Sequence, residues 1–234
     1  MNAWWRRWRR ARALERRAIP DSLWQLTLMR FPFLAVRSKE DLRDLREMAT
    51  LFLAEKEFSG TRGLEITDEM AVAIAAQACL PALKLGLEWL DGFVGIVVHA
   101  DAVLARREVD HAGRSATDGY NVVVHEFAHV IDMRAGVTAN PGEADATTER
   151  GQWLRALAAE HESFAARVDA GEDTFLDPYA AESPEEFFAV GAEAFFVAPD
   201  ELEAELPRTY DLLRSFFRQD PARSRVDRSA PAPG

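Results

Sequence analysis

The 234-residue sequence carries 39 acidic and 28 basic side chains, and its formal charge of −11 at pH 7 argues against nucleic acid as the main partner. Its length fits one large domain with helical additions, and 48% hydrophobic and 29% charged residues are ordinary for a globular protein. The single cysteine, Cys79, excludes an internal disulfide and fits a reducing compartment, so we expect a cytoplasmic protein.

The N-terminal segment, residues 1–18, is basic although the whole chain is acidic. Its arginines alternate with Trp4, Trp5 and Trp8. The pattern fits a solvated basic tail, a helix folded onto the acidic body, or a helix that touches a membrane surface or an acidic partner. The segment is short and its apolar face is narrow, which favours the tail over weak membrane-surface contact. No stretch in it is apolar enough for a signal peptide or a transmembrane span.

Helical periodicity dominates the residues that follow. The sequence predicts a short helix over 21–29, a longer helix opened by Ser38, and a third helix that is capped by Thr67 and ends before Pro81. Residues 93–99 are apolar and β-branched, which predicts a strand.

The next predicted helix, over 121–133, contains the pattern His-Glu-x-x-His at residues 125 to 129. Histidines four apart lie one turn above each other on one helical face, so His125 and His129 can bind one ion, and imidazole is a preferred zinc ligand. Glu126 lies close enough to accept a proton from an attacking water. The alternative is a buried helix whose two histidines are merely hydrogen-bonded. The apolar flanks disfavour it, because polar side chains are costly there unless paired or metal-bound.

Further helices are predicted in the C-terminal part. One covers about 148–168 and leaves His161 on a solvated face, one is opened by Ser183 and Pro184, and a last one covers about 200–217. The polar tail over 219–234 is expected to be disordered.

A catalytic zinc usually has three protein ligands, and the motif supplies two. The metzincin pattern needs a third histidine six residues after the second, but Ala135 occupies that position. The remaining common choice is a glutamate from a later helix, with four candidates: Glu182, Glu185, Glu186 and Glu193. Asp132 and Glu193 are also candidates for fixing the ligand imidazoles, with a plain surface position as the alternative for each.

Five segments carry a family resemblance, over residues 51–56, 65–70, 75–81, 120–129 and 179–188. In them the chain resembles the Mlc titration factor A family of zinc peptidases, which is similar to the catalytic domain of anthrax lethal factor. The resemblance covers most of the chain, from residue 19 to residue 221. It implies a gluzincin with one zinc ion, in which His125, His129 and Glu186 are the ligands, Glu126 is the general base and Tyr179 faces the open coordination position.

The resemblance also implies what the protein does. We expect a mostly helical α+β, zincin-like peptidase domain over 19–218, with a small sheet beside the His-Glu-x-x-His helix. Its activity would be aminopeptidase-like hydrolysis of short peptides. The alternative is a regulatory protein that binds and titrates a transcriptional repressor of the Mlc type, with weak or no peptidase activity.

One segment departs from the family. Members have a longer stretch before the zinc helix, with an apolar strand that contains Gly-Pro and Ser-Trp, whereas residues 100–119 here are short and polar. In zincins such an edge strand pairs with the extended substrate backbone. Its loss leaves the metal chemistry intact and predicts a weak grip on long substrates.

Overall fold

A computed structural model describes four stretches of the chain: residues 18–99, 121–138, 145 and 147–226. The chain divides into two compact units, Met1–Ser115 and Ala116–Gly234. Two of the expectations above, the basic N-terminal tail and the missing edge strand over 100–119, lie outside the described residues. The division of the chain at residues 18 and 218 stays a prediction.

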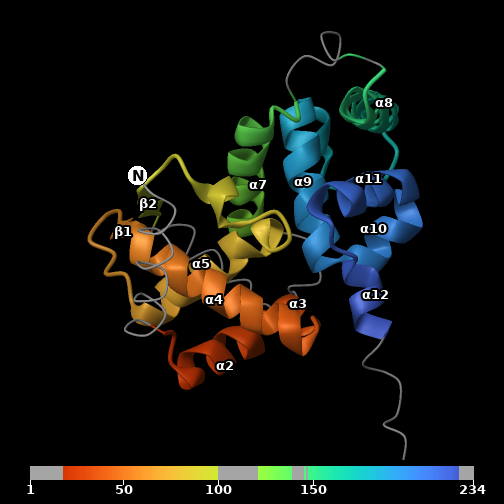
Figure 1. Ribbon diagram of the computed structural model, residues 1–234. Coiled ribbons are helices and arrows are strands. Elements are labelled where there is room, and N and C mark those ends of the chain that lie inside the picture. The colour runs from red at the N-terminus through yellow and green to blue at the C-terminus, as the bar shows by residue number, and fades with distance from the viewer. Residues whose placement is uncertain (1–17, 100–120, 139–144, 146, 227–234) are drawn as a thin grey trace, which may run out of the picture. The chain divides into compact units, whose positions relative to one another are not determined.

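The N-terminal unit is built from helices that pack on α5 (Figure 1). Both predicted helix caps are confirmed, because the Ser38 and Thr67 side chains accept hydrogen bonds from backbone N–H groups three residues on. Most residues of α5 from Val72 onward are buried. The helices are α2 (Asp21–Arg30), α3 (Pro32–Ala35), α4 (Lys39–Glu55) and α5 (Asp68–Ala82).

The end of α5 differs from the prediction. The helix continues through Pro81 to Ala82 instead of ending before the proline. A proline this near the end removes a single backbone hydrogen bond. The side chains of Leu80, Pro81 and Ala82 are all buried, and this burial outweighs the lost bond.

Two short strands complete this unit. The predicted strand is confirmed as β2 (Gly95–Val98), which follows the 3₁₀ helix η1 (Leu87–Leu90) in the chain. It pairs in parallel with β1 (Glu57–Gly60). No strand was predicted for β1, because its serine and glycine are typical of a turn. The Lys56 ammonium holds the segment before β2 by donating to the carbonyls of Leu90 and Phe93, at 2.7 Å each. The mostly helical α+β class is confirmed.

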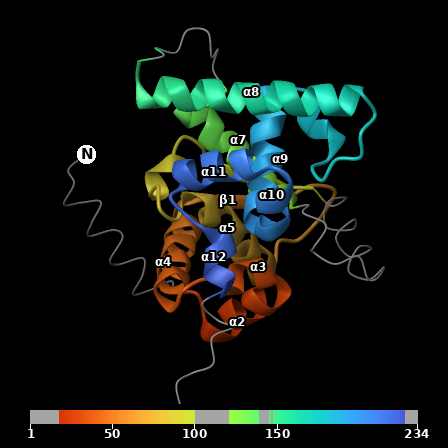
Figure 2. The same cartoon turned by 90° about the vertical axis from the view of Figure 1, so that its right-hand side faces the viewer.

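The C-terminal unit is organised around α9, in which every residue from Phe187 to Val197 is buried. Helices α7 and α9 lie side by side (Figure 1), and Figure 2 shows the length of α8, which contacts α9. Phe217 packs at the centre of an aromatic cluster with Phe188, Phe195 and Phe196. The elements are α7 (Val122–Ala135), α8 (Glu149–Asp169), η2 (Pro178–Ala181), α9 (Pro184–Val197), α10 (Pro199–Glu205), α11 (Pro207–Phe217) and α12 (Pro221–Val226).

The C-terminal end differs from the prediction in two places. The single helix expected over 200–217 is divided into α10 and α11 at Leu206, because Pro207 cannot donate the backbone bond that would continue the first helix. Within the tail over 219–234 that was expected to be disordered, residues 221–226 form α12, and residues 227–234 lie outside the described residues. Asp220 anchors α12 by accepting from the Tyr210 hydroxyl at 2.7 Å, and Ala222 is buried.

Among the residues that the structure describes, none of the helices combines the length and the apolar character needed to cross a membrane.

Candidate metal centre

Residues at both ends of α7 determine where the helix begins and ends, and the spacing of its two histidines places them on one face. The Asn121 side chain begins the helix by accepting from the Val124 N–H at 3.0 Å. Gly136 ends it in the left-handed conformation, with φ 57°, as glycine at this position favours. His125 and His129 therefore lie one turn apart on the same face of a largely buried helix.

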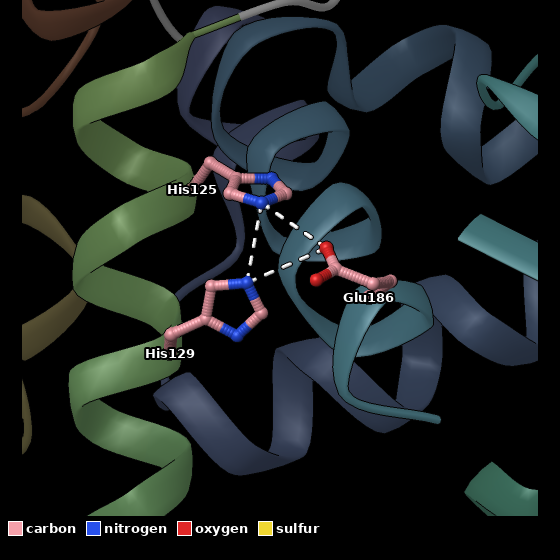
Figure 3. Close-up of side chains that lie close together, drawn as sticks. All are labelled: His125, His129 and Glu186. Carbon is pink, nitrogen blue, oxygen red and sulfur yellow. Dashed lines mark hydrogen bonds and ion pairs between the residues drawn. The ribbon is translucent and has the colours of Figure 1, made fainter. Parts of the chain in front are cut away.

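The third group of the site comes from the first turn of α9. Ser183 caps this helix by accepting from the Glu186 N–H at 3.2 Å, and Pro184 occupies the first helical position. Instead of closing a capping box, the Glu186 carboxylate faces the two histidines across the α7–α9 interface (Figure 3). Of the four candidate glutamates, Glu186 is the one that joins both histidines in a single cluster of the described residues.

Three ligand atoms form a nearly equilateral triangle. His125 Nε2 lies 3.2 Å from His129 Nε2 and 3.2 Å from Glu186 Oε2, and the distance from His129 Nε2 to Glu186 Oε2 is 3.4 Å. Ligands about 2.0–2.2 Å from a tetrahedral ion lie roughly 3.3 Å from one another. Oxygen Oε2 of Glu186 is buried and has no hydrogen-bond partner among the described residues. The triangle therefore fits a divalent metal ion with an open fourth position.

Glu126 and Tyr179 lie at a cavity beside this triangle. The cavity has a volume of about 460 Å³ and is lined by both polar and apolar side chains. Glu126 is exposed. Tyr179 is 44% exposed, and its ring centroid lies 6.4 Å from that of His125. The other lining residues are Val122, Phe175, Leu176, Asp177, Val190, Glu193 and Ala194.

The 3₁₀ helix η2 positions Tyr179. Asp177 begins η2 by accepting from the Tyr179 N–H at 2.9 Å. His161 of α8 lies on the other side, where its Nε2 is 3.3 Å from the Ala181 carbonyl oxygen and its ring centroid is 5.6 Å from that of Phe187. The prediction that His161 lies on a solvated face is therefore wrong. The glutamates on either side of His161 suggested a solvated face, but its contacts come from residues that are distant in the sequence.

The two acidic residues expected to orient ligand imidazoles have different surroundings. Glu193 is 1% exposed, and its Oε2 lies 3.4 Å from His125 Nδ1, as predicted. Asp132 is buried but accepts from the Thr138 N–H and hydroxyl, at 2.9 and 2.7 Å. Its carboxylate thus secures the turn after α7, and the prediction that it orients a ligand imidazole is wrong.

The acidic surroundings change the titration of the central groups. Burial lowers the pKa of His125, but the hydrogen bond and charge of Glu193, together with the charges of Glu186 and Glu126, outweigh burial and raise the pKa overall. Burial also raises the pKa of Glu193, although His125 opposes this shift. The site is therefore an electronegative pocket, as a divalent cation requires.

Comparison with known proteins gives a consistent picture. The sequence model of the family described as Glucose-regulated metallo-peptidase M90 matches residues 5–114 and 99–218. Protein slr2042 of Synechocystis, described as uncharacterized, is 32% identical over 250 positions, which cover 93% of this chain and 90% of that protein. Mlc titration factor A of Klebsiella pneumoniae is 32% identical over 229 positions, covering 85% and 86% of the two chains. The protein of the same name from Yersinia pestis is 29% identical, covering 82% and 83%.

The first of these alignments also bears on chain length. It extends over 250 positions, whereas the present chain has 234 residues, so the Synechocystis protein carries residues that have no counterpart here. The two ranges matched by the family model overlap at residues 99–114, the region where the sequence predicts the shortened segment.

The cluster predicts the metal content of the purified protein. We expect about one divalent metal ion per chain, and substitution of His129→Ala or Glu186→Ala should each empty the site, because two remaining ligands bind far more weakly than three. Metal analysis after gel filtration measures this. The matched control is Glu182→Ala, an exposed carboxylate outside the cluster, which should retain the ion. Full occupancy in both ligand variants would refute the ligand assignment.

Proposed function

This chain belongs to the glucose-regulated metallopeptidase M90 family, and we propose that it is a zinc-dependent peptidase that hydrolyses short peptides. The observation that carries the proposal is the triangle of His125, His129 and Glu186, whose ligand atoms lie 3.2–3.4 Å apart beside a cavity. Two imidazoles and one carboxylate are the donor set of many catalytic zinc sites. A structural zinc site would instead have a closed fourth position.

The chain's own residues supply the rest of the chemistry. When bound, the ion polarises the substrate carbonyl and lowers the pKa of a water molecule. Glu126 lines the cavity next to a ligand and acts as the general base, which takes a proton from the attacking water and passes it to the leaving amine. The Tyr179 hydroxyl donates a hydrogen bond to the oxygen on which negative charge develops.

The cavity supports a small substrate. Its volume of about 460 Å³ accommodates one or two residues, and its lining combines apolar side chains with the carboxylates of Glu126, Asp177 and Glu193. We therefore propose aminopeptidase-like hydrolysis of short peptides. The single cysteine, which is buried, supports a place in the cytoplasm.

A second candidate function is protein binding. Several relatives have the name Mlc titration factor A, which favours a regulatory protein that captures a transcriptional repressor. The polar and shortened sequence of residues 100–119 also favours binding over efficient proteolysis. Glu126 favours the enzyme, because a protein that only binds a partner has no use for a base beside the ion.

The role of Glu126 is tested by Glu126→Gln. The amide keeps the size of the side chain but cannot accept the proton, so turnover of a chromogenic aminoacyl substrate should fall by about 100-fold or more at unchanged metal content. Glu162→Gln, which changes an exposed carboxylate on α8, is the matched control and should keep full turnover. Wild-type turnover in Glu126→Gln would assign the activity to another site or to a contaminant.

Tyr179→Phe tests the stabilisation of developing charge. The ring remains and the hydroxyl is lost, so kcat should fall by about 100-fold while KM changes little. Steady-state kinetics on the same substrate measures both constants. An increase in KM at constant kcat would instead make Tyr179 a residue that binds the substrate in its ground state.

Substrate length tests the consequence of the shortened segment. Without a sheet edge, long peptides gain no series of main-chain hydrogen bonds, so short chromogenic substrates should be cleaved weakly and long peptides hardly at all. A mixed peptide library analysed by mass spectrometry measures this, with Glu126→Gln as the blank. Efficient internal cleavage of long peptides would show that the substrate groove is complete. No cleavage of any substrate by the metal-loaded protein would favour the binding function.

A further inference from the structure

Glu193 is a buried carboxylate that lines the cavity beside the metal triangle. It lies on α9 among side chains that are all buried, and it is itself 1% exposed. Its Oε1 has no hydrogen-bond partner among the described residues, and its Oε2 faces only His125 Nδ1, at 3.4 Å. Burying a carboxylate with so few partners costs free energy, and an apolar residue of similar size would cost none. A role at His125 explains why a carboxylate occupies this position.

The two glutamates of α9 contact opposite sides of one imidazole. Glu186 and Glu193 are seven residues apart, about two helical turns, so they lie on the same face of α9. Glu186 Oε2 is 3.2 Å from His125 Nε2, and Glu193 Oε2 is 3.4 Å from Nδ1. The ring of His125 is therefore held by α9 at both of its nitrogens.

An ion at Nε2 is compatible with only one tautomer of His125. A neutral imidazole carries its hydrogen on one nitrogen and a lone pair on the other. A hydrogen on Nδ1 can point to Glu193, and the lone pair of Nε2 is then free to face His129 and Glu186. The opposite tautomer could donate from Nε2 to Glu186, but it would place the Nδ1 lone pair against Glu193 and would leave no lone pair on Nε2 for an ion.

We propose that Glu193 is a positioning residue, which fixes the tautomer and ring orientation of His125 so that Nε2 is ready to bind the metal ion. The inference rests on the metal site of the proposed function. A residue in this role lowers the thermal stability of the metal-free protein and raises its affinity for zinc. A carboxylate that merely joined α7 to α9 would instead stabilise the metal-free and the metal-bound protein alike.

The test is zinc titration of metal-free protein against a chromophoric chelator, together with thermal melting of the same metal-free samples. Glu193→Met removes the acceptor at similar volume and should weaken zinc binding by about 10- to 100-fold. Glu193→Gln keeps an acceptor oxygen without the charge and should have an affinity between wild type and Glu193→Met. The melting temperature of metal-free Glu193→Met should equal or exceed that of the wild type.

The matched control is Asp132→Asn. It changes another buried carboxylate of this unit, which contacts Thr138 and no ligand imidazole. This variant should melt at a lower temperature and bind zinc with unchanged affinity.

The outcomes separate this inference from the proposed function. The positioning role would be overturned if Glu193→Met bound zinc as tightly as the wild type. It would also be overturned if metal-free Glu193→Met melted at a lower temperature and the zinc affinities did not fall in the order wild type, Glu193→Gln, Glu193→Met. If Glu193→Met does not fold, Glu193→Gln decides, because an affinity equal to that of the wild type overturns the role. Failure of the wild type to bind zinc, or full binding by His129→Ala, would instead overturn the proposed function.

Discussion

The packing of α7 against α9 is the constraint on which the site depends. Each helix supplies an incomplete group of ligands, with two imidazoles on α7 and one carboxylate on α9. Side-chain packing between the helices determines their relative register, and a shift of one helical turn would move Glu186 by about 5.4 Å, out of reach of both histidines. The burial of nearly all of α9 therefore fixes ligand geometry as well as stability.

Burying polar groups at this interface costs free energy, so their presence there points to a function. Oε2 of Glu186 and Oε1 of Glu193 are buried oxygen atoms without a hydrogen-bond partner among the described residues. Native proteins contain few such atoms, and those that remain often mark a site that completes its bonding with a ligand. The same helix interface thus carries both an apolar core and three ligand atoms, from His125, His129 and Glu186, that one cation can bind together.

Much of this could be predicted from the sequence wherever the cause is local. Side chains that cap helices act within three residues, so Ser38, Thr67 and Ser183 were found from sequence alone. Two histidines four residues apart share a face of any helix, so the pair on α7 needed no tertiary information. The third ligand was different, because residues 182, 185, 186 and 193 were equal candidates until a family resemblance favoured Glu186. Only the contact between α7 and α9 places its carboxylate beside both histidines.

The errors have tertiary causes as well. Strand β1 exists because β2 pairs with it, and its own sequence is typical of a turn. Pro81 is accepted within α5 because its surroundings are buried, and His161 is held by a carbonyl twenty residues away. Asp132 has the helical spacing of a residue that supports a ligand, but the chain after α7 turns back and Thr138 takes its carboxylate.

The central claim is that one zinc ion lies among His125, His129 and Glu186. Anomalous diffraction from a crystal of the zinc-loaded protein, measured on both sides of the zinc absorption edge, tests it most directly. The predicted result is a single strong peak at about 2.0–2.2 Å from Nε2 of both histidines and from a Glu186 carboxylate oxygen. A peak at other residues, or none at this triangle in a fully loaded crystal, would contradict the claim.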